Sequence, residues 1–180
     1  MRVAEYGADM GGDGSNALSK GQIETGRRAL FVAVGLVWGF RSLQSFSDPQ
    51  FSDPHNVNDW VAVLALTLAM WLVAPALLLL PQPAAARWPA RCAAAAAVVV
   101  GLANLMEDGF GVEGAGIGFG LGNAVLLLSC VAMSALCLIK SPRWAAVVPV
   151  ATAVGLLLLE NAGGLLVLAV WWFAAWRIDR

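Results

Sequence analysis

Charged residues are scarce in this sequence of 180 residues. They make up 13% of the chain, whereas 59% of the residues are hydrophobic and the mean hydropathy is +0.73. A soluble domain carries about 25% charged residues. The composition therefore excludes an ordinary soluble domain and predicts a multi-pass protein embedded in the lipid bilayer. We expect no nucleic-acid partner.

Histidine and cysteine are scarce too. The one histidine, His55, cannot by itself form a bis-histidine haem site or a histidine-rich metal site. The three cysteines (Cys92, Cys130 and Cys137) lie in or beside apolar runs, and their odd number argues against a disulfide framework. We interpret them as small buried hydrophobic residues and expect no metal and no cofactor.

Catalytic motifs are missing from the sequence. It has no Walker A loop, no His-Glu-x-x-His, no Gly-x-Ser-x-Gly and no Cys₂His₂ spacing. Ser129 and Ser134 lie within a predicted membrane helix that offers no histidine to activate them. An intramembrane enzyme is therefore the least favoured functional class.

Long apolar runs dominate what remains. Six of them follow a polar, glycine-rich tail of residues 1–26, which we expect to be disordered. No small-residue cleavage site follows a short apolar region, so we expect the first run to be retained rather than cleaved as a signal peptide. The sequence predicts an all-α fold, with residues 27–180 forming six transmembrane helices in three hairpins. The predicted spans are 29–46, 60–80, 92–106, 117–139, 144–159 and 164–176.

Basic residues indicate the orientation of these helices. Ten of the eleven fall in the tail, in the even-numbered turns or at the C-terminus, and only Arg41 falls on the other side. Because cytoplasmic loops carry the excess of lysine and arginine, both termini are predicted to be cytoplasmic. We expect an integral protein of a bacterial cytoplasmic (inner) membrane.

The first external loop repeats Phe-Ser-Asp-Pro, at 46–49 and at 51–54. Proline cannot continue a helix, and serine and aspartate can bond their own backbone, so the repeat is typical of a turn. We expect Asp59 to cap the second helix. The alternative is a cation or partner surface, for which the candidate side chains are Asp48, Asp53, Asn56 and Asn58.

Polar residues near the outer ends of the predicted helices are the candidate binding site. Counted from the inner arginines at about 1.5 Å per residue, Arg41, Glu107 and Glu160 reach a similar depth. Ionisable residues within a span are functional candidates, but the favoured interpretation of these charges is an arginine–glutamate lock between helices. A substrate or ion site is the second interpretation, and snorkelling of the side chains to the surface is the third. The full set is Arg41, Asn104, Glu107, Asp108, Glu160 and Asn161.

Glycine has two patterns in the sequence. Val-Gly-Leu precedes the outer charge in three helices, at 34–36, 100–102 and 154–156, which hints at three related hairpins. Alternate glycines that run from just before the fourth predicted span into its first turns form a small-residue face suited to close helix packing. These are Gly114, Gly116, Gly118, Gly120 and Gly122.

These features leave two main hypotheses for function. The first is a membrane binding, accessory or transport-related subunit that uses the outer polar residues, with a small solute or another membrane subunit as its partner. The alternative is a structural or assembly subunit that packs on a partner through the glycine face. The inner half of the predicted bundle is almost wholly apolar, which argues against a continuous ion path.

Overall fold

The computed structural model describes residues 13–47, 56–158 and 162–178, and these residues form helices and connecting turns without a strand. The π-helical turn Leu105–Gly109 continues α3, and the short 3-10 turn Ala84–Ala86 precedes it. The fold is therefore all-α, as predicted. The helices are α1 Asp13–Ser47, α2 Val57–Leu79, α3 Arg87–Asn104, α4 Ala115–Lys140, α5 Arg143–Leu157 and α6 Gly163–Arg177.

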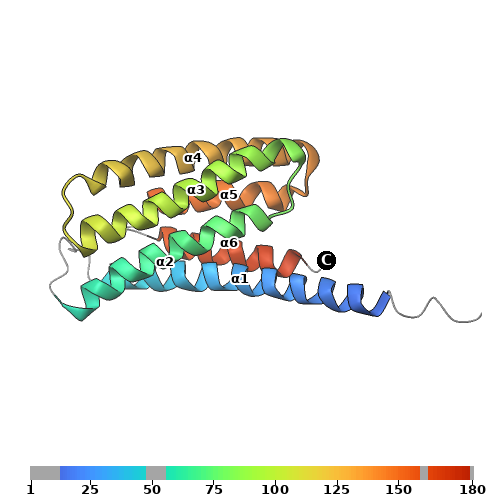
Figure 1. Cartoon of the computed structure of the whole chain (residues 1–180), viewed down its shortest axis with the longest axis horizontal. Coiled ribbons are helices and arrows are strands. Elements are labelled where there is room, and N and C mark those ends of the chain that lie inside the picture. The colour runs from blue at the N-terminus through green and yellow to red at the C-terminus, as the bar shows by residue number, and fades with distance from the viewer. Residues whose placement is uncertain (1–12, 48–55, 159–161, 179–180) are drawn as a thin grey trace, which may run out of the picture.

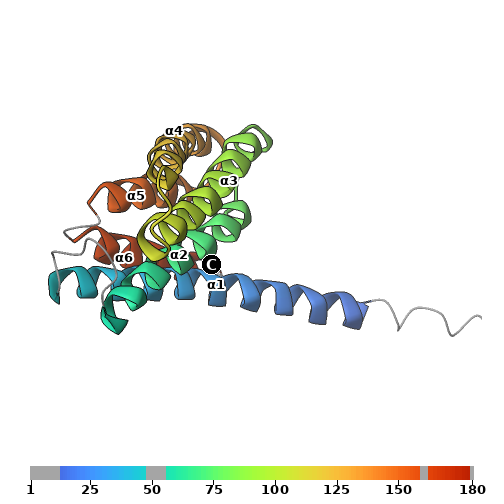
Figure 2. The same cartoon turned by 60° about the vertical axis from the view of Figure 1, so that its left-hand side comes forward.

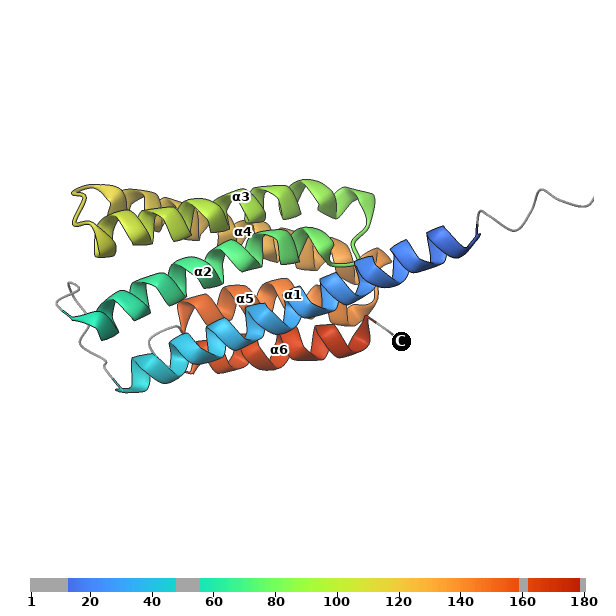
Figure 3. The same ribbon diagram turned by 60° about the horizontal axis from the view of Figure 1, so that its bottom comes forward.

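Four stretches within the described residues are long and apolar enough to cross a membrane. They are Gly21–Phe46, Val57–Leu79, Ala84–Gly109 and Ala115–Ile139. The other two helices, α5 and α6, are apolar but have only 15 residues each. At 1.5 Å per residue each is about 22 Å long, and Figure 3 shows both stopping short of the end that α3 and α4 reach.

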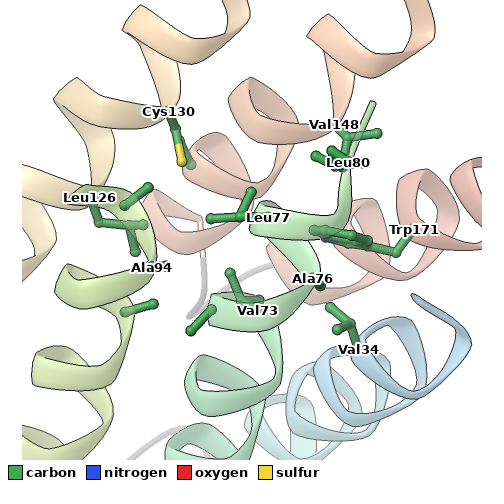
Figure 4. Close-up of a cluster of buried hydrophobic side chains, with 14 of the residues drawn as sticks. Val34, Val73, Ala76, Leu77, Leu80, Ala94, Leu126, Cys130, Val148 and Trp171 are labelled. Atoms are coloured by element: carbon green, nitrogen blue, oxygen red, sulfur yellow. The ribbon is translucent and has the colours of Figure 1, made fainter. Parts of the chain in front are cut away.

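The six helices form a closed ring in chain order. Each helix packs against its neighbours in the sequence, and α6 returns to pack against α1. Figures 1 and 2 show α3, α4 and α5 on one side of the bundle and α1, α2 and α6 on the other. Large side chains from several helices are fully buried between them, among them Phe31, Trp38, Met70, Met133 and Trp171. Figure 4 shows part of this core, where Val34, Leu77, Leu126 and Trp171 converge from α1, α2, α4 and α6.

The first helix begins earlier than the sequence predicts. It starts at Asp13, so residues 13–26 are helical although we expected a disordered tail there. Residues 21–26 are exposed, and Figure 1 shows this part of α1 projecting past the bundle. Good helix formers such as Ala17, Leu18 and Gln22 let the membrane helix extend outward, because propagation costs less than nucleation. The prediction for residues 1–12 falls outside the described residues.

The two ends of the bundle differ in charge. Among the side chains that the structure describes, one end has six arginines and the single carboxylate of Glu24, and we call it the basic end. The other end has four carboxylates and Arg41, and we call it the acidic end. The arginines are Arg27, Arg28, Arg87, Arg91, Arg143 and Arg177, and the carboxylates of the acidic end are Asp59, Glu107, Asp108 and Glu113.

Two of the three Val-Gly-Leu glycines make the same contact. A Cβ at Gly101 would lie 2.7 Å from Trp71 Nε1 and 3.1 Å from the Thr67 carbonyl oxygen, which belongs to the residue four positions before that tryptophan. A Cβ at Gly35 would lie 2.8 Å from Trp172 Cδ1 and 3.2 Å from the Leu168 carbonyl oxygen, again four positions earlier. The α2–α3 and α6–α1 contacts are thus built alike.

The third glycine of this pattern, Gly155, does not contact a tryptophan. A Cβ there would meet the Val167 side chain and the Gly163 carbonyl oxygen, both in α6. The structural similarity therefore covers the first two Val-Gly-Leu segments and stops at α5, where the glycine instead packs within the short α5–α6 hairpin.

Candidate functional site

Arg41 is the cation of the acidic end. It lies in the apolar part of α1 and is half-buried, and its Nη1 donates a hydrogen bond to Ser45 Oγ one turn further on. The negative charge of Asp108 stabilises the guanidinium by Coulomb attraction. The Nε atom is buried and has no hydrogen-bond partner among the residues described. This guanidinium can therefore donate a further hydrogen bond to an anionic or carbonyl oxygen of a ligand.

The two adjacent carboxylates that follow α3, Glu107 and Asp108, have different surroundings. Both belong to the π-helical turn Leu105–Gly109, a wide turn that often occurs at functional sites. Asp108 is the electrostatic partner of Arg41, whereas the Glu107 carboxylate lies over Gly116 so closely that a Cβ there would overlap it. Gly116 lies in the first turn of α4, where unpaired amides and the helix dipole favour a negative charge.

Asn104 belongs to a helix contact. It is buried, and its Nδ2 donates to the Val63 carbonyl at 3.1 Å and to Thr67 Oγ1 at 3.0 Å. Thr67 Oγ1 in turn donates to the Gly101 carbonyl at 3.3 Å. Both amide hydrogens of Asn104 therefore bind α2. Asn104 thus contacts α2, whereas Glu107 and Asp108 lie in the π-helical turn that follows it.

Three polar residues that the sequence analysis missed follow Arg41 in α1. Ser42, Gln44 and Ser45 are all buried. Gln44 Nε2 donates to the Asn58 carbonyl at 2.8 Å and so connects the end of α1 to the start of α2. The polar run Arg-Ser-Leu-Gln-Ser at 41–45 was the available signal, and treating residues 29–46 as one apolar run concealed it.

The remaining predicted site residues, Glu160 and Asn161, fall outside the described residues. The start of α6 is described, and a Cβ at Gly164 would overlap the Trp38 carbonyl and lie 2.7 Å from Ser42 Cβ. The beginning of α6 is thus packed beside the residue that follows Arg41. The predicted role of Glu160 in this cluster stays a prediction.

The start of α2 corrects one prediction for the external loop. Asn56, not Asp59, is the N-cap: its Oδ1 accepts hydrogen bonds from the backbone N–H groups of Asn58 at 2.7 Å and Asp59 at 3.1 Å. The Asp59 carboxylate accepts from the Asn56 N–H at 3.0 Å, which completes a capping box. The Asn56 side-chain oxygen thus serves the helix rather than a cation surface. Asp48 and Asp53 fall outside the described residues.

The glycines of the fourth predicted span do not form one uniform face. Gly114 has a φ of +86° and precedes α4, and nothing lies within 4 Å of a Cβ at Gly120. A Cβ at Gly118 would be at an ordinary 3.5 Å from Ala103 Cβ, whereas at Gly122 it would be 2.7 Å from Val100 Cγ2. The close contacts, at Gly116 and Gly122, are made within the same chain, with Glu107 of the π-helical turn and with α3 respectively.

Neither metal ligation nor similarity to a known protein identifies the site. Within residues 13–47, 56–158 and 162–178, no group of three or more histidine, cysteine, aspartate or glutamate side chains could hold a metal ion. Comparison with protein-family models, with curated proteins and with solved structures finds no match.

Proposed function

We propose that the chain crosses the membrane six times, with its basic end and both termini in the cytoplasm. Ten of eleven basic residues on one side support this orientation. At about 22 Å, α5 and α6 are shorter than the usual hydrocarbon core of about 30 Å. The aromatic and basic residues Trp144, Trp176 and Arg177 at their ends can hold them in a locally thinner bilayer. A bacterial cytoplasmic membrane is the proposed location.

We further propose that the protein is a binding or accessory subunit whose site is the cluster around Arg41 at the outer end. The carrying observation is the half-buried guanidinium, which has Ser45 and Asp108 beside it and an Nε donor without a partner among the described residues. An ionisable residue within a membrane helix is costly and most often serves a function. The ligand is a small solute or a polar segment of another membrane subunit.

The packed core supports an accessory role over transport. Towards the basic end, Phe31, Leu77, Met133 and Trp171 are fully buried between the helices. A solute bound at Arg41 would need these side chains to separate before it could pass. Transport through this chain alone is therefore the weaker form of the proposal.

Assembly through the glycine face is the second candidate. It has less support because Gly116 and Gly122 are already in contact with Glu107 and with α3 of the same chain. Among the glycines of this face that lie within α4, Gly120 alone has no neighbour within 4 Å of a Cβ and is open to a partner helix.

The proposed role of Arg41 is tested by purification in mild detergent, followed by mass spectrometry of the proteins and small molecules that co-purify. When equal amounts of folded protein are compared, we expect the wild type to retain a ligand or subunit that Arg41→Gln binds about tenfold more weakly, if one charge-assisted hydrogen bond is removed. The matched control is Arg143→Gln, which removes an exposed arginine from the basic end. The same set of bound molecules in wild type and Arg41→Gln would contradict the proposal.

A further inference from the structure

A second candidate site lies at the basic end. A pocket of about 400 Å³ opens where α1, α6 and two interhelical turns meet. Its two charged residues come from different helices, Arg27 from α1 and Arg177 from the end of α6. The other lining residues are Pro81, Pro142, Trp144 and Ile178. Two guanidinium groups thus line a pocket whose remaining wall is apolar or aromatic.

The charges of this pocket lack a counterion in the part of the chain described. None of its lining residues is acidic. Arg27 is half-buried, and its buried Nε atom has no hydrogen-bond partner among the described residues. The Arg177 guanidinium lies 5.8 Å from the ring centres of Phe173 and Trp176, which hold a cation in place without neutralising it. The geometry is that of an anion site with two planar, fork-shaped donors.

We infer that this pocket binds the headgroup of an anionic phospholipid. The pocket is at the ends of the apolar helices, the level at which a bilayer places its phosphates, and basic pockets between membrane helices bind such headgroups. The apolar wall of Pro81, Trp144 and Ile178 suits the glycerol and upper acyl chain. A zwitterionic headgroup would bring an ammonium group that finds no carboxylate in the pocket lining, so a net negative headgroup is favoured. This inference does not depend on the role proposed for Arg41.

The test is native mass spectrometry of the full chain, titrated with phosphatidylglycerol or with phosphatidylcholine of the same acyl chains. We expect one phosphatidylglycerol to bind about tenfold more tightly than phosphatidylcholine. Arg27→Gln with Arg177→Gln should weaken its binding by about a hundredfold, since each lost charge-assisted hydrogen bond lowers the affinity by about tenfold. The control is Arg87→Gln with Arg143→Gln, which removes the same charge from exposed positions outside the pocket and should change affinity by less than about twofold.

Three results would overturn the inference: equal binding of the two lipids, an equal loss in the pocket and control variants, or displacement by inorganic phosphate at concentrations as low as the lipid requires. The last would make the pocket a site for free phosphate. If the double variant does not fold, the single variants Arg27→Gln and Arg177→Gln are titrated instead, and each is expected to weaken phosphatidylglycerol selectively. Unchanged lipid affinity in both single variants would equally refute the site.

Discussion

Gly164→Ala is expected to lower the melting temperature of the detergent-solubilised protein by several degrees. A Cβ at Gly164 would overlap the Trp38 carbonyl oxygen and lie 2.7 Å from Ser42 Cβ. A carbonyl within a helix cannot rotate away as a side chain can, so α1 and α6 must separate where they close the ring. Overpacking of this kind costs about 1–3 kcal/mol.

The matched control is Gly120→Ala, in a helix and with nothing within 4 Å of the added Cβ. Alanine is favoured over glycine inside a helix by about 1 kcal/mol, so this change should leave the melting temperature unchanged or raise it. Equal melting temperatures for the two variants would show that α6 does not pack on α1 as described.

Loss of Arg41 or of Asp108 alone is expected to destabilise the fold more than loss of both. Each single change, Arg41→Gln or Asp108→Asn, leaves a charge in a partly buried place without its electrostatic partner. An unpaired charge there is worse than no charge. We expect a coupling free energy of about 0.5–3 kcal/mol from the double-mutant cycle, measured as melting temperature and folded yield.

Glu107→Gln supplies the control for this cycle. Its carboxylate lies against Gly116 at the start of α4, so combining it with Arg41→Gln should give additive losses. Coupling of Arg41 to Glu107 with none to Asp108 would reverse the assignment of the two carboxylates. Loss of ligand binding in Arg41→Gln at an unchanged melting temperature would identify the cluster as a site rather than a lock.

Most of the helix positions could be predicted from the sequence. The spans 60–80, 144–159 and 164–176 differ from α2, α5 and α6 by a few residues. Apolar runs give this information because a membrane helix satisfies its own backbone hydrogen bonds within hydrocarbon and ends where polar residues reach water. Which of these helices cross the membrane is a separate question, because the short α5 and α6 satisfy composition but not length.

The surroundings of individual polar residues could not be read from the sequence. The sequence grouped Asn104, Glu107 and Asp108 in one candidate site, but Asn104 binds α2, Glu107 lies against Gly116 and Asp108 interacts with Arg41. The two carboxylates lie in a π-helical turn. A turn of this kind depends on packing against α2 and α4 and leaves no periodic signal. The cap of α2 was misassigned for a similar reason: Asn56 and Asp59 are both good capping residues, and only the backbone shows that the helix starts after Asn56.

The glycines show what the sequence can predict about helix packing and what it cannot. The sequence indicated that glycine would permit close packing, and Gly35, Gly101 and Gly122 have such neighbours. It did not indicate the partner helix, since the same residue type at Gly120 meets nothing within 4 Å. The partner is set by the order of the helices around the ring, which depends on the whole chain.

Accessibility of the α5–α6 turn is the most direct test of the six-span arrangement. Ala162 in this turn is exposed. The test variant combines Ala162→Cys with Cys92→Ser, and it retains Cys130 and Cys137 because both are buried. Intact cells or right-side-out vesicles are treated with a membrane-impermeant maleimide. Asn58→Cys is the control for the outer side and Ala85→Cys the control for the cytoplasmic side, both at exposed positions. We predict labelling of Ala162→Cys and Asn58→Cys from outside, and of Ala85→Cys only after permeabilisation.

Labelling of Ala162→Cys only after permeabilisation would contradict six crossings and make α5 and α6 a hairpin that does not reach the outer surface.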